Sequence, residues 1–390
     1  MANRIPRVPV REQDPKVRAT NFEEVCYGYN VEEAMLEATR CLHCKNPRCV
    51  GACPVGIKIP DFIEKVKDGD FAAAAAVLGA CVGSFLNVCI YRIPLDQSVV
   101  RPRSHCMSCG ALIPWYHNLP VVSYFVLRGR CARCGARFSF RYAAVEALVA
   151  LLFVAVFCAF PPAGASAPLG IVPVSLGGAE GAVPSLRPLG AIPVRWLFVS
   201  GLVIGTFVDF DHYFLPDSVT IGGMAAGLVC SLLVPEIQPL LVFVHAAPDG
   251  PVTAIRFAEA HSRWAALALS AAGLAAGFGG LQAVRAAGTR FFRRIGHIGP
   301  EEEAMGFGDV KLLGAIGAFF GPLGALVTVV LGAVAGVLVA VPLLLAGRRT
   351  LLSRIPFGPY LSLGALLWLL WGRRLVLAYL LFAPPWRVAL

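Results

Sequence analysis

The sequence predicts an all-α polytopic membrane protein with about eight transmembrane helices, a cysteine-rich cytoplasmic loop and a small helical N-terminal module. Three observations support this fold class. Of the 390 residues, 57% are hydrophobic and 15% are charged, whereas a soluble domain is about 25% charged. Apolar segments long enough to span a bilayer recur from residue 71 onward. Two CxxC pairs lie in the polar, arginine-rich segment between the first two of these apolar segments.

Residues 1–70 differ in composition from the rest and are predicted to form a soluble module. They contain eleven Lys/Arg and eleven Asp/Glu, so the whole net charge of +10 belongs to residues 71–390. A stretch rich in Glu and Ala predicts a helix over Val31–Arg40, and a further short helix is expected before residue 71. Nucleic acid is not an expected partner, because no folded soluble face gathers the arginines of residues 71–390.

Four cysteines of this module follow the pattern CxxCxxxxCxxxCP, which is typical of iron–sulfur ligands. They are Cys41, Cys44, Cys49 and Cys53. Zinc is the weaker alternative, because the ligands do not form two separated pairs. The stretch resembles the N-terminal iron–sulfur domain of the glutamate synthase small subunit and of dihydropyrimidine dehydrogenase. That resemblance implies further cysteines, flavin and NADPH domains downstream, but here an apolar segment follows. We therefore interpret residues 1–70 as a fused fragment without a catalytic role, joined through the Ala-rich segment at 71–77.

The apolar segments predict eight membrane spans. The stretch Leu312–Ala346 has 35 apolar residues, which is too long for one span, and Gly-Pro-Leu-Gly at 321–324 predicts a turn within it. The predicted spans are 71–92, 142–160, 192–211, 217–234, 264–284, 311–321, 322–346 and 357–383.

The distribution of arginines orients these spans. Arg92–Arg141 contains eight Arg and one acidic residue, so this loop is expected in the cytoplasm. Residues 161–190, with one Arg, are then outside, and the basic stretches 285–294 and 348–354 are inside. The same alternation places residues 1–70 outside, where a cytosolic iron–sulfur fragment does not belong, which again favours a fusion.

The two CxxC pairs of the cytoplasmic loop predict a zinc knuckle. The four cysteines are Cys106, Cys109, Cys131 and Cys134, with 21 residues between the pairs. This spacing is typical of a closed tetrahedral Zn²⁺ site without an open coordination position. We predict a structural ion that stabilises a loop with too little apolar content to fold alone. A disulfide pair is the alternative, which a cytoplasmic location disfavours.

Two acidic motifs lie at the predicted cytoplasmic ends of spans. Asp209 belongs to DFDHYFLPD on the third span, and Asp309 belongs to MGFGDVKLL on the sixth. An ionisable group in a span is energetically expensive and therefore a functional candidate. Two converging carboxylates share one proton, which leaves one acid and one base to activate water against a peptide carbonyl. Two alternatives stay open: helix capping, especially for Asp211 and Asp217, and proton coupling in a membrane transporter.

At this point residues 78–383 resemble a known family, the bacterial type IV prepilin peptidases of the GxGD aspartic protease type. The matching segments are LGACVGSFLNVCIYRIP, the two CxxC pairs, NLPVVSYFVLRGRC, RYAAVE, DFDHYFLPD, MGFGDVKLLGAIGA and IPFGPYL. The resemblance implies a multi-pass enzyme of the bacterial inner membrane. It implies cleavage of the leader from type IV prepilins and pseudopilins after a glycine, at the cytoplasmic face. Asp209 and Asp309 match the two catalytic aspartates of the family.

The resemblance also implies a second activity, N-methylation of the new pilin N-terminus with S-adenosylmethionine. Gly129 and Glu146 fall in the part associated with methylation, although Glu146 can equally be a polar anchor. Lys311 can hold substrate or extend its ammonium group to the membrane surface. The expected domains are therefore the fragment 1–70, the methyltransferase-associated part 71–160 and the peptidase domain 192–383.

One departure concerns spacing, since the two aspartates are 100 residues apart, longer than is usual in the family. The excess is expected in Pro235–Arg263, on the outer side.

Overall fold

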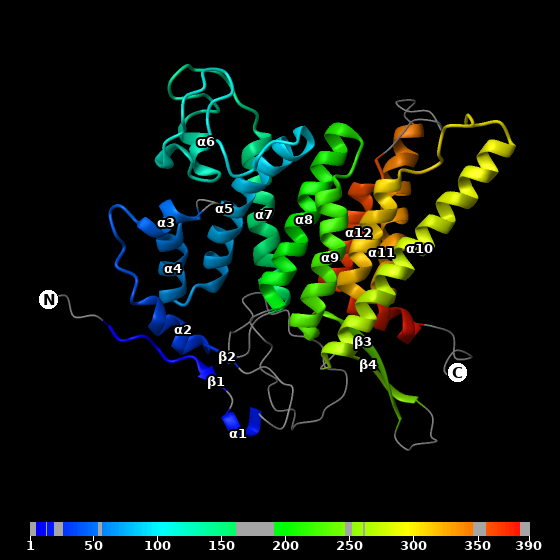
Figure 1. The fold of residues 1–390 in the computed structure, drawn as a ribbon, viewed down its shortest axis with the longest axis horizontal. Coiled ribbons are helices and arrows are strands. Elements are labelled where there is room, and N and C mark those ends of the chain that lie inside the picture. Colours follow the sequence, from blue (N-terminus) through cyan, green and yellow to red (C-terminus); the bar gives the residue numbers. More distant parts are fainter. Residues whose placement is uncertain are drawn as a thin grey trace. The chain divides into compact units, whose positions relative to one another are not determined.

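A computed structural model describes residues 5–12, 14–18, 26–53, 57–160, 191–245, 252–259, 262–345 and 356–382. The predicted outer loop 161–190 and the predicted inner arginines at 348–354 lie outside the described residues. The chain divides into two compact units, Met1–Trp196 and Leu197–Leu390, which we describe separately (Figure 1).

The first unit begins with a small module of short elements. They are β1 (Arg11–Glu12), α1 (Pro15–Arg18), β2 (Cys26–Gly28), α2 (Val31–Ala38), α3 (Arg48–Ala52) and α4 (Ile59–Lys67). Strands β1 and β2 pair antiparallel. Helix α2 starts at a capping box, because the Asn30 side chain accepts from the Glu33 backbone N–H while the Glu33 carboxylate accepts from the Asn30 N–H. The predicted helix over Val31–Arg40 is thus present, and α4 packs against both α2 and α5.

Two long apolar helices complete this unit, α5 (Phe71–Arg92) and α7 (Arg141–Ala159). They pack closely because two glycines of α5 face α7. A Cβ at Gly79 would lie 2.8 Å from the Cα of Ala150, and one at Gly83 would lie 2.8 Å from the Cα of Glu146. Between the two helices come η1 (Ile93–Leu95), η2 (Trp115–His117) and α6 (Val122–Val126).

The Ala-rich start of α5 packs into the core of this unit. Ala75 is 3% exposed and packs in one cluster with Phe157, Cys158 and Ile192. Phe71 stacks on Phe157 with ring centroids 6.4 Å apart. Small side chains are needed here because the neighbouring helix approaches closely, so this segment is part of the core.

The second unit is a bundle of helices. Helix α8 (Ala191–His212) enters it from the first unit, and α9 (Asp217–Leu233), α10 (Arg263–Arg294), α11 (Phe307–Leu345) and α12 (Gly358–Phe382) follow. Helix α11 packs against α9, α10 and α12 (Figure 1). Glycines bring α10 and α11 together, since a Cβ at Gly273 would lie 2.1 Å from the Gly317 carbonyl oxygen.

Helix α11 is interrupted at Gly321, within the predicted turn. Gly321 has φ 71° and ψ −177°, a conformation essentially restricted to glycine. Gly332 lies against Tyr360, near the start of α12, whereas Gly324 lies against Trp368, further along it. The second half of α11 therefore runs antiparallel to α12.

The break leaves one backbone carbonyl without its helical hydrogen-bond donor, and three side chains donate to it instead. Pro322 has no N–H, so the Ala318 carbonyl lacks its helical partner four residues on. It accepts instead from Gln238 Nε2 at 2.8 Å and Ser270 Oγ at 2.6 Å, with Ser231 Oγ at 3.5 Å. In an apolar surrounding an unsatisfied carbonyl is costly, so these bonds stabilise the interruption.

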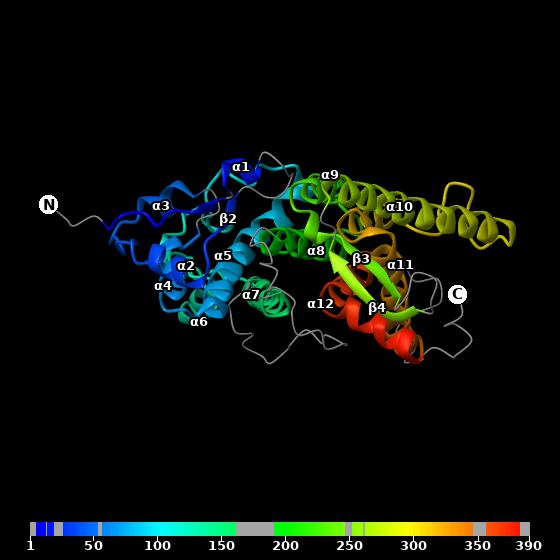
Figure 2. The ribbon, with the colours of Figure 1, turned by 90° about the horizontal axis from the view of Figure 1, so that it is seen from below.

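The segment predicted to carry the extra length contains η3 (Pro235–Ile237) and a β-hairpin, which the all-α prediction did not include. Strands β3 (Pro239–His245) and β4 (Val252–Glu259) pair antiparallel, with Pro239 opposite Glu259. The hairpin follows the end of α9 (Figures 1 and 2).

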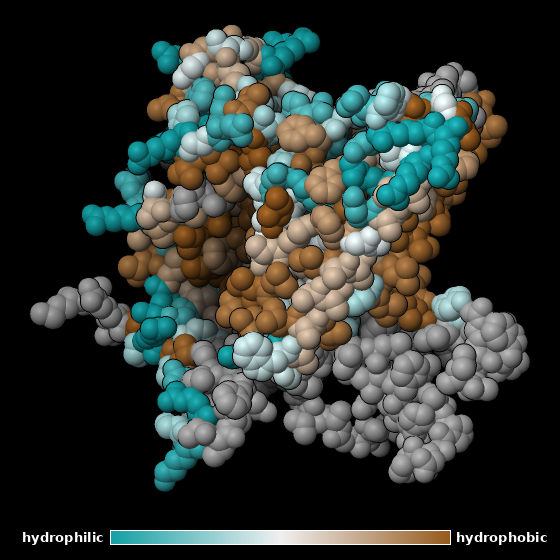
Figure 3. Space-filling view, turned by 45° about the vertical axis from the view of Figure 1, so that its right-hand side comes forward, coloured by the Kyte–Doolittle hydropathy of each residue, from teal (hydrophilic) through white to brown (hydrophobic). Residues whose placement is uncertain are grey.

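Helix length and composition indicate a multi-pass membrane protein. Within the described residues, five helical segments are long and apolar enough to span a membrane: Phe71–Leu95, Arg141–Ala159, Ala191–His212, Arg263–Arg294 and Phe307–Leu345. Asp217–Leu233 is apolar but shorter. The space-filling view shows hydrophobic side chains over the flanks of the helices (Figure 3). The mostly helical polytopic fold is confirmed, while the number of eight spans stays a prediction.

Candidate active site

Asp209 lies in the last turn of α8, and the motif that follows turns the chain into α9. The Tyr213 N–H donates to the Asp209 carbonyl at 3.0 Å, and Tyr213 has φ 57°, a left-handed conformation that ends helices. Pro216 then precedes the first residue of α9. Asp209 is 6% exposed, and within the described part of the chain its Oδ2 atom has no hydrogen-bond partner. A buried carboxylate oxygen that the fold leaves unpaired is available for chemistry.

Asp309 is the third residue of α11 and is also buried, with 8% exposure. The two glycines of the GFGD motif are packed on different neighbours. Gly306 faces the Asp309 carboxylate, since a Cβ there would lie 3.4 Å from Oδ2. Gly308 faces Leu215, at 3.1 Å from its Cβ. The motif therefore lets the backbone pass close to both the carboxylate and the α8–α9 turn.

The structure brings the two aspartates together. Gly358, at the start of α12, links them, because a Cβ there would lie 2.6 Å from Asp209 Oδ2 and 3.3 Å from Leu215 Cδ1. Leu215 in turn contacts Gly308, beside Asp309. The Asp209 charge also acts electrostatically on the Asp309 carboxyl. Two carboxylates from helix ends 100 residues apart in sequence thus share one buried site.

Gly358 was not among the predicted site residues. It belongs to the IPFGPYL segment, and a glycine at the start of an apolar helix was the only signal in the sequence.

Lys311 lies two residues after Asp309 and pairs with Asp217. The Lys311 Nζ atom is 2.6 Å from Asp217 Oδ1, and the side chains are 19% and 62% exposed, respectively. Lys311 Nζ also lies 5.0 Å from the centroid of the Phe307 ring. Asp217, the first residue of α9, is therefore an ion-pair partner that joins α9 to α11. Asp211 is exposed at the end of α8.

The four loop cysteines form two knuckles of the same geometry. In each, the first cysteine donates its N–H to an alanine carbonyl five residues on, and a left-handed glycine closes the turn. The sequences are Cys106–Ala111 and Cys131–Ala136, with Gly110 at φ 66° and Gly135 at φ 73°. The backbone N–H groups of Cys109 and Ser108 lower the pKa of Cys106 to about 6. Those of Cys134 and Arg133 likewise lower the pKa of Cys131. The first cysteine of each knuckle therefore favours the thiolate, the form that binds metal.

This sulfur cluster has the dimensions of a tetrahedral metal site. All four Sγ atoms lie within 4.8 Å of one another, and Cys106 Sγ is 3.8 Å from Cys134 Sγ. Four thiolates about 2.3 Å from a central zinc would be about 3.8 Å apart. A disulfide needs about 2.0 Å between sulfurs, so the geometry fits a shared metal and not a disulfide between Cys106 and Cys134.

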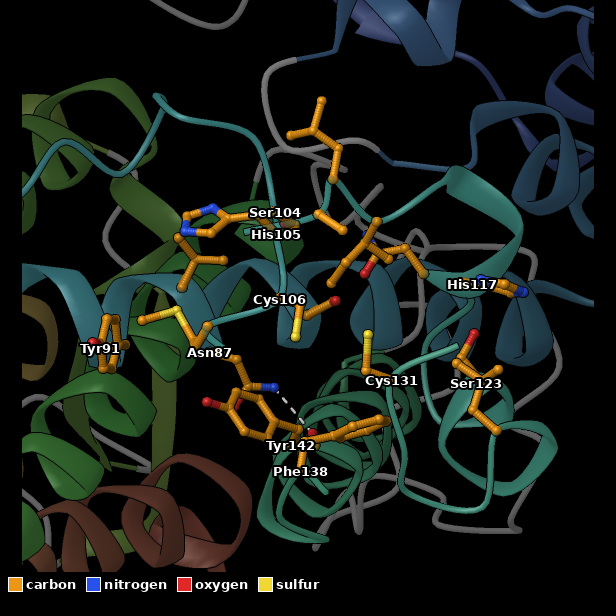
Figure 4. Close-up of a pocket in the computed structure, with 18 of the residues that line it drawn as sticks. Asn87, Tyr91, Ser104, His105, Cys106, His117, Ser123, Cys131, Phe138 and Tyr142 are labelled. Atoms are coloured by element: carbon orange, nitrogen blue, oxygen red, sulfur yellow. Dashed lines mark hydrogen bonds between the residues drawn. The ribbon is translucent and has the colours of Figure 1, made fainter. Parts of the chain in front are cut away.

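The same loop forms a cleft of 1240 Å³ with α5 and α7. Its lining includes Asn87 and Tyr142, linked by a hydrogen bond of 3.0 Å from Asn87 Nδ2 to the Tyr142 carbonyl, with Cys106 and Cys131 nearby (Figure 4). Glu146 also lines the cleft.

Glu146 and Gly129 shape the loop beside this cleft. Glu146 Oε2 accepts the Val121 N–H at 2.6 Å. Val121 has φ 61°, which is strained for a β-branched residue, and the bond from the Val122 N–H to the Pro120 carbonyl closes a γ-turn around it. Gly129 has φ 64°, and a Cβ there would lie 3.1 Å from the Tyr124 ring. No pattern in the sequence predicted the Val121 turn.

The N-terminal cysteines are not gathered in the same way. Among the described residues, the loop tetrad is the group whose ligand atoms are close enough to hold a metal. Cys44 and Cys49 are exposed, and Cys41 and Cys53 are half-buried. Binding of an iron–sulfur cluster by these residues stays a prediction.

Three protein-family models match parts of the chain. Residues 77–160 match the bacterial peptidase A24 N-terminal domain, and residues 196–341 match the type IV leader peptidase family. Residues 18–90 match the dihydropyrimidine dehydrogenase domain II, 4Fe-4S cluster family. No solved structure matches this chain.

Three similar proteins carry the name prepilin leader peptidase/N-methyltransferase. The protein from Myxococcus xanthus is 36% identical over 284 residues, which cover 72% of this chain and 66% of the relative. The protein from Pseudomonas putida is 30% identical over 324 residues, covering 77% and 91%. The protein from Aeromonas hydrophila is 29% identical over 323 residues, covering 77% and 90%.

Proposed function

Because this chain belongs to the bacterial prepilin leader peptidase/N-methyltransferase family, we propose that Asp209 and Asp309 are the carboxylates that cleave its prepilin substrates. The observation that carries the proposal is their burial in one site from two separate helix ends. The cut follows a glycine of the leader at the cytoplasmic face of the bacterial inner membrane. The substrates are type IV prepilins and the related pseudopilins, whose apolar segments reach the enzyme through the lipid bilayer.

The pair performs acid–base hydrolysis of a peptide bond. One carboxylate, ionised, removes a proton from the attacking water, while the other, protonated, donates a proton to the developing oxyanion. Oδ2 of Asp209 is buried without a hydrogen-bond partner among the described residues, and in this proposal it contacts the attacking water once substrate is bound. A transporter that uses the same aspartates for proton coupling finds no support in the family to which the chain belongs.

In this proposal, residues 71–160 carry the site for N-methylation. The cleft offers one carboxylate, Glu146, and aromatic rings that include Tyr91, Tyr124 and Phe138. The rings suit the adenine ring of S-adenosylmethionine, and the four arginines of the lining, Arg92, Arg101, Arg133 and Arg137, suit the carboxylate of the same ligand. S-adenosylmethionine bound there would supply the methyl group for the new pilin amine. Glu146 holds the Val121 turn and Gly129 leaves room for Tyr124, so both residues keep the cleft in shape.

Zinc held by the four loop cysteines is structural in this proposal, because four thiolates leave no open coordination position. Residues 1–70 are proposed to be a fused fragment without a catalytic role, and residues 192–383 to be the peptidase domain.

Mass spectrometry of a processed prepilin tests the proposed function. Purified detergent-solubilised protein is incubated with a prepilin, first alone and then with S-adenosylmethionine. We expect a cut directly after the leader glycine, followed by the gain of one methyl group on the new N-terminus. Uncut prepilin, under conditions where a related peptidase processes it, would refute the protease assignment. A cut product that is never methylated would refute only the second activity.

A further inference from the structure

One face of α10 holds the segment that leads into Asp309. Three side chains of this face, four residues apart, form hydrogen bonds with three backbone groups of the segment Glu302–Met305. Arg293 Nη2 donates to the Glu302 carbonyl at 2.9 Å, Thr289 Oγ1 accepts from the Ala304 N–H at 3.2 Å, and Arg285 Nε donates to the Met305 carbonyl at 3.2 Å. The segment is thus fixed to a helix and not left as a free loop.

Arg285 makes the largest set of these contacts. Besides its bond to Met305, its guanidinium pairs with the Glu303 carboxylate and donates from Nη1 to Gln282 Oε1 at 3.2 Å. Its Cζ lies 5.1 Å from the centroid of the Phe307 ring. The Arg285 side chain is only 13% exposed. A planar guanidinium can serve all of these partners at once, which an ammonium cannot.

Phe307 is held from several sides, two residues before Asp309. Arg285 and Lys311 both lie over its ring, and the Phe278 ring meets it edge-on at 5.9 Å. Gly306 and Gly308 flank Phe307, so the local sequence restricts the backbone conformation of this segment only weakly. The position of Asp309 therefore depends on contacts made by neighbouring helices.

We propose that Arg285 is a positioning residue for Asp309: it fixes the segment Glu303–Phe307 so that the Asp309 carboxylate stays in the site of Asp209. This inference rests on the proposed protease function. Arg285 belongs to α10, which the sequence presented only as a helix ending in a basic cytoplasmic stretch.

Steady-state cleavage of a prepilin by Arg285→Gln tests the proposal. We expect kcat to fall roughly 100-fold, because a displacement of about 1 Å costs about that much. KM should change less than about threefold, because in this proposal Arg285 does not touch the substrate. Arg285→Lys keeps the charge but cannot serve Met305 and Glu303 together, so we expect only partial recovery. Arg290→Gln is the matched control, since Arg290 is exposed on another face of α10, and its kcat should equal that of the unchanged protein.

Hydrogen–deuterium exchange of residues 300–312 gives a second readout that does not depend on activity. We expect faster exchange in Arg285→Gln than in Arg290→Gln. Unchanged kcat and unchanged exchange in folded Arg285→Gln would overturn the inference. If Arg285→Gln does not fold, kcat and exchange are measured for Arg285→Lys and Thr289→Val instead. Unchanged values in both of these variants would then overturn the inference. If the unchanged protein cuts no prepilin, the proposed function fails, and exchange alone decides on the role of Arg285.

Discussion

At the residue scale, the carboxylate of Asp209 is confined by a glycine far along the chain. A Cβ on Gly358 would lie 2.6 Å from Asp209 Oδ2, below the 3.0 Å that real Cβ contacts respect. Any side chain at position 358 must therefore move the carboxylate or the start of α12. Catalytic groups tolerate such displacement poorly, because reacting atoms need near-attack geometry.

We expect Gly358→Ala to lower kcat for prepilin cleavage by about tenfold or more, through displacement of Asp209. Gly222→Ala on α9 is the control, because a Cβ there meets nothing within 4 Å. Both variants should elute as the unchanged protein does in gel filtration. Full activity of Gly358→Ala would show that the contact with Asp209 does not matter for catalysis.

The sequence identified some site residues and missed others for a physical reason. Asp209 and Asp309 stand in local motifs that mark them as unusual, since carboxyls at span ends are costly. Gly358 and Arg285 act through contacts with residues distant in the chain, and no local pattern records such contacts. The ion pair of Lys311 with Asp217 also joins residues distant in the chain, so the sequence did not predict it. Either residue alone looks like an ordinary charge near a membrane surface.

At the element scale, the break in α11 depends on Gly321 and on the carbonyl that Pro322 leaves free. The sequence predicted the turn from span length and from Gly-Pro-Leu-Gly. It could not predict that Gln238, Ser231 and Ser270 would meet the Ala318 carbonyl, because these residues belong to other elements. The sequence analysis did not predict the hairpin β3–β4, because it assigned the segment Pro235–Arg263 only as extra length between the two aspartates.

Gly321→Ala should destabilise the protein by roughly 1–3 kcal/mol, the usual strain of a non-glycine residue in a conformation of this kind. Thermal unfolding in detergent measures the change. Gly279→Ala on α10 provides the comparison, because its added Cβ meets nothing within 4 Å and its backbone is helical. Equal unfolding temperatures for the two variants would mean that the break at Gly321 relaxes without cost.

The cysteine loop is the second element with a clear test. We expect about one zinc ion per chain by elemental analysis, as a closed four-thiolate site requires. Cys109→Ser should lose the metal and make the loop Pro102–Arg141 more sensitive to limited proteolysis. Cys230→Ser, which lies on α9 outside the tetrad, should keep both metal and protease resistance. Full zinc content in Cys109→Ser would rule out the four-cysteine site.

At the scale of the whole molecule, the chain divides into two compact units. The family match at 77–160 lies in the unit Met1–Trp196, and the match at 196–341 lies, apart from its first residue, in the unit Leu197–Leu390. The iron–sulfur family match reaches residue 90 and so extends into α5. Composition revealed the change near residue 70, but the packing of Ala75 against Phe157 required coordinates.

Replacing both Cys44 and Cys49 by Ser should leave prepilin cleavage unchanged, because neither residue belongs to the peptidase unit. Iron and sulfide analysis of anaerobically purified protein accompanies the assay. Stoichiometric iron in the unchanged protein, together with slower cleavage by the variant, would overturn the view of residues 1–70 as a fragment without a catalytic role.

The most direct measurement of the central claim is kcat for prepilin cleavage by Asp209→Asn and Asp309→Asn, with Asp211→Asn as the comparison. Each asparagine removes one ionisable oxygen while keeping the side-chain size. We predict that either change at the buried pair lowers kcat by about 1,000-fold or more, as loss of a general acid or base does. Asp211→Asn should stay within about threefold of the unchanged protein, since general acid–base groups alone carry such large effects. Cleavage at the normal rate by folded Asp209→Asn or Asp309→Asn would contradict the assignment of these two carboxylates.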